Sequence, residues 1–202
     1  EQMASIPSSL KDAFHSFPPQ QQPSLSFPLG LGAAGVHEIC EASHGDFPAM
    51  TGFALAARTR RKGPVIWIRQ SSLKQAHGGL LQAGCREVAP DLPPSLNITP
   101  RKPAEALWAT EEAIRSGVAS LVIAELEDAS FTASRRLALV SGRHGTPVIL
   151  LMPYTRDGAT AANARWRLSP PPSSPPRYHP PAPGAPPSLA APARPRPAPP
   201  PA

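Results

Sequence analysis

The sequence predicts an α/β fold in which helices flank a mostly parallel sheet. Continuous apolar runs, at residues 64–68 (PVIWI) and 147–152 (PVILLM), are typical of strands that are covered on both faces. Segments with apolar residues at helical spacing lie between such runs, and this alternation indicates βαβ units. The sequence shows no internal repeat.

Composition divides the chain into three parts. Roughly half of residues 169–202 are proline, and this tail carries arginines but no acid, so it cannot bury enough apolar surface to offset the entropy of ordering. Residues 1–31 form a similarly poorly ordered arm, in which only residues 6–17 suit a short helix or a docking segment. The predicted core is residues 32–168, near the commonest domain size.

The charge and cysteine content favour a cytoplasmic protein without a membrane span. The net charge is +6, and much of the excess comes from the tail arginines and the cluster at residues 58–62. A solvated helix end and a basic tail explain this charge, although clustered Lys and Arg also suit weak contact with DNA phosphates. Cys40 and Cys85 lack any C-x-x-C spacing, which indicates a reducing compartment, and Cys40 is expected in the core. No run reaches the length of a membrane span, and the first residues do not resemble a signal peptide.

The stretch at residues 35–62 predicts a strand, a turn-rich loop and a helix. Residues 36–40 form the strand, and residues 41–48 form the loop. Four residues with helical spacing give the helix one apolar stripe: Met50, Phe53, Ala54 and Ala57. We expect Asp46 as the N-cap, Pro48 in the first turn, and the basic residues 58–62 in the last turn before Gly63.

This stretch is where a nucleotide-binding α/β protein carries its phosphate loop, but the chemistry of such a loop is missing. A working loop needs G-x-x-x-x-G-K-[ST], in which the lysine reaches the phosphates and the hydroxyl holds Mg²⁺. The degenerate loop contains Ser43, Gly45 and Thr51, with no lysine before Thr51 and with the negative charge of Asp46 near the phosphate position. We therefore predict a fold that once bound nucleotide and now has neither a catalytic site nor a cofactor.

The remaining elements follow in order. Residues 70–94 give no clear prediction, and residues 96–99 suit a short strand. Pro103 opens a helix that runs through Ser116, with Ala104, Leu107, Trp108 and Ile114 on its apolar side. Residues 121–124 form the clearest buried strand, and Thr132 is placed to cap a helix that ends at His144-Gly145.

The order of the blocks resembles the ImuA family, the RecA-like proteins of bacterial SOS mutagenesis cassettes. The resemblance covers residues 34–174, and it is carried by the blocks GVHEIC, TGFALAAR, GPVIWIRQ, PAEALWATEEAIRSGVASLVIAEL, TASRRLALVSGRHGTPVILL and ARWRLSPPPS. It implies a core of P-loop NTPase type that is similar to RecA but lacks a usable phosphate loop. Glu125 occupies a place comparable to the Walker B acid, and without a phosphate loop we expect it to be solvated or paired rather than a metal ligand.

The resemblance also implies a function. Members of the family are thought to be non-enzymatic accessory proteins of error-prone translesion DNA synthesis. They are expected to act as adaptors for ImuB, a catalytically inactive relative of Y-family polymerases, for an error-prone polymerase, and for RecA.

Two clusters outside the predicted loop are candidate partner-binding residues. Arg165, Trp166 and Arg167 suit a partner interface or a stacked base, or Trp166 simply packs the last strand against the sheet edge. Arg135 and Arg136 could face DNA or RecA, but a charged outer helix face explains them as well. The histidines show no spacing typical of a metal site.

Two rival functions are weighed against the adaptor. A DNA-stimulated ATPase would need Arg58, Arg61 or Lys62 in place of the missing lysine. These lie about three helical turns from the loop, roughly 15 Å at 1.5 Å per residue, too far to reach a bound phosphate. A SulA-like SOS cell division inhibitor is the second rival, and it rests on resemblance alone.

Overall fold

The computed structural model describes residues 31–32, 34–58 and 61–170. Nearly all of the predicted arm and tail lie outside these ranges, so the two domain boundaries stay predictions.

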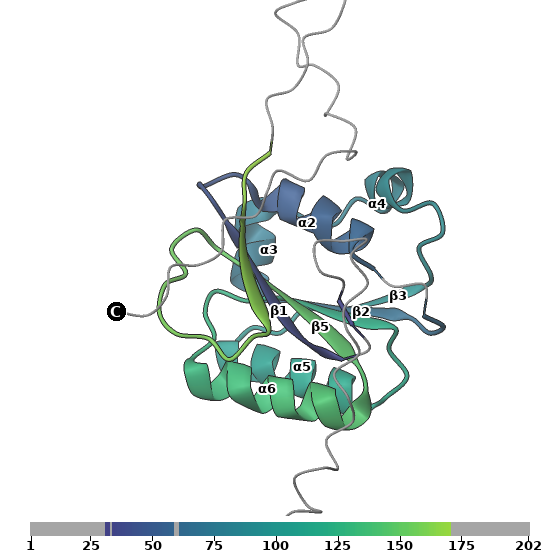
Figure 1. Cartoon of the computed structure of the whole chain (residues 1–202). Coiled ribbons are helices and arrows are strands. Elements are labelled where there is room, and N and C mark those ends of the chain that lie inside the picture. The colour runs from purple at the N-terminus through teal and green to yellow at the C-terminus, as the bar shows by residue number, and fades with distance from the viewer. Residues whose placement is uncertain (1–30, 33, 59–60, 171–202) are drawn as a thin grey trace, which may run out of the picture.

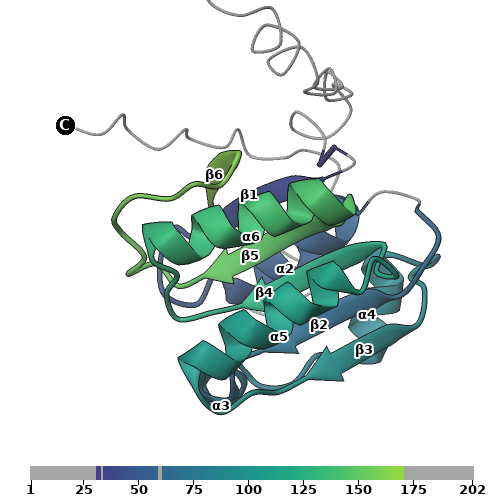
Figure 2. The ribbon, with the colours of Figure 1, turned by 90° about the horizontal axis from the view of Figure 1, so that it is seen from below.

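The described residues form one wholly parallel six-stranded sheet (Figures 1 and 2), with the strand order β3-β2-β4-β5-β1-β6. The strands are β1 (Gly35–Glu41), β2 (Val65–Arg69), β3 (Ser95–Ile98), β4 (Leu121–Glu125), β5 (Pro147–Met152) and β6 (Ala164–Leu168). The expected α/β fold is confirmed.

Helices cover both faces of this sheet. Figure 1 shows α5 (Pro103–Arg115) and α6 (Phe131–His144) on one face, and α2 (Phe47–Ala56), α3 (Ser71–His77) and α4 (Gln82–Val88) on the other. Figure 2 shows α5 and α6 side by side along their face. None of the helices within the described ranges is long and apolar enough to cross a membrane.

The alternation of strand side chains builds two hydrophobic cores. On β2, Ile66 and Ile68 point into the core under α5 and α6, whereas Val65 and Trp67 point into the core under α2 and α4. All six residues of β5 are buried. Each fully buried aliphatic side chain stabilises the fold by about 1.5–3 kcal/mol, so the central strands hold the sheet together.

Helix α2 has the predicted apolar stripe but ends earlier than expected. Met50, Phe53 and Ala54 are buried, and the helix begins after Asp46 with a proline in its first turn. It ends at Ala56, so the placing of residues 58–62 in its last turn was wrong. Just beyond this helix end, the Arg58 guanidinium pairs with Asp91 (2.5 Å), and the arginine side chain is only 7% exposed.

Two other local predictions were wrong. The N-cap of α6 is Ser130, whose hydroxyl accepts a hydrogen bond from the Ala133 N–H (3.2 Å), rather than Thr132. Trp108 is not on the buried side of α5 but 63% exposed. The buried side of this helix is made by Ile114 and a row of small residues, Ala106, Ala109 and Ala113, which let the helix approach the sheet closely.

Candidate functional site

The loop between β1 and α2 folds back on itself instead of forming an open cradle. The Ser43 N–H donates to the Asp46 carboxylate (3.0 Å), and the Asp46 N–H donates to the Ser43 carbonyl (3.2 Å). Gly45 permits this turn because its φ is +101°. The hydroxyl of Thr51 donates to the Phe47 carbonyl within its own helix (3.4 Å).

The first residue of α2 brings an aromatic ring to this place. Phe47 is 2% exposed, and its ring stacks on that of His77 with 4.3 Å between the centroids. His77 in turn lies 6.4 Å from the ring of His44 in the loop. The start of α2 is therefore flanked by rings and by the Asp46 carboxylate, which do not resemble the lysine and glycine amides that bind phosphate.

Glu125, the residue in the Walker B-like position, is locked inside the sheet. It ends β4 directly opposite Arg69, which ends β2, and its side chain is fully buried. Arg69 Nη2 donates to Oε1 (2.5 Å), Arg69 Nε forms an ion pair with Oε2, and the Trp67 indole N–H donates to Oε1 (2.6 Å). Burial raises the pKa of the Glu125 carboxyl, and hydrogen bonding to Arg69 opposes this rise.

The pairing of Glu125 has a direct chemical consequence. Mg²⁺ takes oxygen ligands and keeps several waters, so a metal ion here would have to displace Arg69 from the carboxylate. The guanidinium, whose side chain is 9% exposed, would then be a buried charge without its partner, at a cost of several kcal/mol. Glu125 is thus paired rather than solvated. In the part of the chain that the structure describes, no group of three or more His, Cys, Asp or Glu residues could hold a metal ion.

Two of the three cations that the ATPase hypothesis could use, Arg58 and Arg61, make contacts elsewhere. Arg58 pairs with Asp91, and Arg61 donates to the carbonyl of Gly145 (2.5 Å), just before β5 begins. The β1–α2 loop follows the carboxyl end of β1, whereas Gly145 precedes the amino end of the parallel neighbour β5. Arg61 therefore lies near the amino ends of the strands, whereas the loop lies at their carboxyl ends.

Arg165, Trp166 and Arg167 lie on β6, the edge strand beside β1, which the sequence did not predict as a strand. Strand alternation sends the two arginines to one face and Trp166 to the other, where it is half-buried against the core under α2. Arg165 Nε donates to the buried Glu38 (2.7 Å), and Arg167 donates to backbone carbonyls that include that of Arg156 (2.8 Å). The three side chains do not form one continuous surface.

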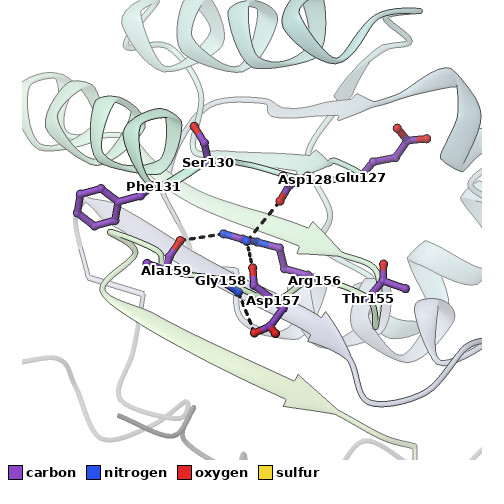
Figure 3. A pocket seen from close by; sticks show the side chains of 9 residues that line it. All are labelled: Glu127, Asp128, Ser130, Phe131, Thr155, Arg156, Asp157, Gly158 and Ala159. Carbon is purple, nitrogen blue, oxygen red and sulfur yellow. Dashed lines mark hydrogen bonds and ion pairs between the residues drawn. The ribbon is translucent and has the colours of Figure 1, made fainter. Parts of the chain in front are cut away.

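An arginine that sequence reasoning missed organises the crevice in Figure 3. This crevice of about 510 Å³ lies beyond the carboxyl ends of β4 and β5, and Arg156 in its wall is 6% exposed. Arg156 Nε donates to Glu38 (2.9 Å), Nη2 donates to the Ala129 and Ala159 carbonyls (2.8 and 3.1 Å), and Nη1 pairs with Asp128 (3.3 Å). These contacts hold the segment before β6 against β1. The signal in the sequence was Glu38, a charged residue in the middle of a strand that is expected in the core.

Arg135 and Arg136 lie on the solvent side of α6, as a charged outer helix face requires. Both are exposed, and Arg136 pairs with Glu111 of α5 (2.6 Å) while its side chain stays 64% exposed. Arg115 of α5 pairs with the same carboxylate (2.5 Å). This network ties α5 to α6.

The described residues therefore define an α/β protein with a parallel sheet, in which the loop between β1 and α2 lacks the lysine of a phosphate-binding loop. A comparison with protein-family models gives no match. Among curated proteins, the chain is 30% identical over 163 residues to Protein ImuA of Caulobacter vibrioides, in strain NA1000 / CB15N and in strain ATCC 19089 / CIP 103742 / CB 15. This similarity covers 73% of the chain, and it supports the assignment of the chain to the ImuA family.

Two facts limit what these comparisons say about function. The chain spans 64% of the length of the ImuA relatives that it matches. Among solved structures, SulA from Pseudomonas aeruginosa is similar with a TM-score of 0.46 and 17% identity, over 58% of this chain and 97% of that chain. A similarity at this level supports no functional assignment.

Proposed function

We propose that this chain is a non-enzymatic accessory protein of SOS-induced, error-prone translesion DNA synthesis. The similarity to the ImuA proteins supports the accessory role. The observation that carries the non-enzymatic part is the buried contact of Glu125 with Arg69 and Trp67, because a P-loop enzyme needs this acid free to help hold Mg²⁺.

The proposed mode of action is that of an adaptor. A RecA-like core without nucleotide chemistry still offers a rigid sheet with helical faces on which partner proteins can bind. We place an ImuB-type polymerase relative, an error-prone DNA polymerase and RecA as these partners, with at most weak direct contact to DNA. This partner set follows from the family resemblance.

Of the two predicted clusters, the outer face of α6 is the better contact candidate. The described side chains there are exposed, whereas those of β6 contribute to holding the sheet edge. A charged rim residue typically changes the rate of association, so reversing its charge weakens binding without disturbing the fold. Arg135 is the preferred position because reversing the charge of Arg136 would also break its pair with Glu111.

The test is co-purification of the full chain with the ImuB-type protein and with RecA from the same cell. We expect stable binding of at least one partner and weaker binding by Arg135→Glu. Lys74→Glu is the matched control, since Lys74 is an exposed cation on α3, on the opposite face of the sheet. Equal binding by both variants would show that the outer face of α6 does not contact the partner. A folded chain that binds neither protein would contradict the adaptor role itself.

A nucleotide assay tests the non-enzymatic part separately. We expect the purified chain to show no ATP hydrolysis above background, with or without single-stranded DNA. Hydrolysis that disappears in the Glu125→Gln variant would show that the acid is catalytic and would overturn the proposal.

A further inference from the structure

An apolar groove lies between α2 and α4 on the face of the sheet opposite α5 and α6. Its volume is about 290 Å³, and its apolar lining includes Phe47, Leu55, Leu80, Leu81, Cys85 and Val88. Leu81 is 73% exposed and Val88 is 37% exposed, and both line the groove. Neighbouring apolar side chains at the mouth of a groove are typical of a surface that is covered by another segment.

The described part of the chain begins on this same face of the sheet. Leu31, the first described residue, is 6% exposed and belongs to the hydrophobic core under α2 and α4. Its carbonyl oxygen lies 3.3 Å from Nε2 of His37 on β1, which fixes this starting point. Thirty residues precede Leu31 in the sequence.

One stretch of these residues has the pattern of an amphipathic helix. Leu10, Phe14 and Phe17 recur at i, i+4 and i+7, whereas Lys11 and Asp12 fall on the polar side. A helix this short is not stable in water by itself, so burial of its apolar side is what would order it. The thirteen residues between Phe17 and Leu31 span up to about 40 Å, well beyond the ~15 Å length of α2.

We propose that residues 9–17 of this chain dock as a short amphipathic helix into the groove between α2 and α4, with Leu10, Phe14 and Phe17 against Leu81 and Val88. The docked segment covers apolar surface that the domain otherwise exposes to water. The mode is that of a helix in a groove, with anchors one and two turns apart.

Cys85 reports directly on this contact because it is a half-buried thiol in the wall of the groove. Cys40 is fully buried and serves as an internal reference, since burial raises the pKa of its thiol to about 11. We expect Phe14→Ser with Phe17→Ser to increase the rate of Cys85 alkylation by iodoacetamide by roughly tenfold, which corresponds to ~1.4 kcal/mol of docking free energy. Phe27→Ser makes the same change in the same arm outside the segment and should leave the rate unchanged. Equal alkylation rates in all three proteins would overturn the proposal.

Limited trypsin digestion tests the contact from the groove side. Lys11 is the only Lys or Arg before Arg58, so cleavage there reports on the segment alone. Leu81→Asp should accelerate cleavage at Lys11, whereas Leu96→Asp, at a 55% exposed leucine on the edge strand β3, should not. Protection of Lys11 that increases with protein concentration would instead place the segment in the groove of a second copy, and this result would overturn docking within one chain.

Discussion

At the scale of single residues, the described domain is unusual in the charges that it buries. Glu38 and Glu125 are both 0% exposed; Glu38 is held by Arg156 and Arg165, and Glu125 is held by Arg69. A buried carboxylate with such partners is costly to disturb, because removing one partner leaves a desolvated charge. The same pairing removes Glu125 from metal chemistry.

This pairing makes stability depend on pH once Arg69 is lost. Arg69→Met should destabilise the fold by about 3–5 kcal/mol at neutral pH. Without Arg69, the burial of Glu125 raises its pKa with less opposition, from the Trp67 hydrogen bond and His77 only, so near neutral pH the folded state binds more protons than the unfolded state. The free energy of unfolding therefore falls as pH rises from the ordinary Glu pKa of about 4.3 through the raised value.

The measurement is urea unfolding of the Arg69→Met variant and the wild type at about pH 5.5 and about pH 8, since both lie above the ordinary pKa of Glu. We expect the difference between the two proteins to be larger at the higher pH. The double variant Arg69→Met with Glu125→Gln, which cannot ionise at position 125, should lose this pH dependence. A difference that is the same at both pH values would show that Glu125 does not carry the effect.

At the scale of helices and strands, the apolar pattern predicted most of what was found. The runs at residues 64–68 and 147–152 became β2 and β5 almost to the residue, because strands covered on both faces need continuous apolar sequence. Strand β6 was missed because an edge strand with alternating Arg and Trp lacks that run. The pairing of Arg69 with Glu125 was missed as well, since it follows from the strand order, which places β2 beside β4.

The cap of α6 gives the sharpest test at this scale. Ser130→Ala should lower the free energy of unfolding by about 1 kcal/mol, because the Ala133 N–H loses its acceptor. Thr132→Ala, a matched removal of an exposed hydroxyl two residues away, should change it by less than about 0.5 kcal/mol. Chemical denaturation measures both. The reverse order would show that the helix begins where the sequence pattern placed it.

At the scale of the whole molecule, the closed phosphate-loop position and the exposed surfaces are consistent with the proposed role as an adaptor. The sheet is parallel, and the phosphate-loop position after β1 is closed by Phe47 and His77, beside the buried pair of Arg69 with Glu125. The crevice beyond β4 and β5 is lined by Arg156, which is held in ion pairs with Glu38 and Asp128. The outer face of α6 is exposed on one side of the sheet, and the groove beside α2, where we propose that residues 9–17 dock, lies on the opposite side. Such a protein is suited to bring other proteins together, which is the central claim of the proposed function.

The most direct test of this claim is damage-induced mutation in the source organism after deletion of the gene, with the wild-type chain or the Glu125→Gln variant supplied in its place. Glutamine keeps an oxygen that accepts from Trp67 and Arg69 but leaves the buried Arg69 charge unpaired, so the variant should be less stable than the wild type. Its expression is therefore adjusted until an immunoblot shows wild-type abundance. The adaptor account predicts that deletion lowers the mutation frequency and that the variant restores it as fully as the wild type. A variant at wild-type abundance that fails to restore mutation, or a deletion without effect, would contradict the account.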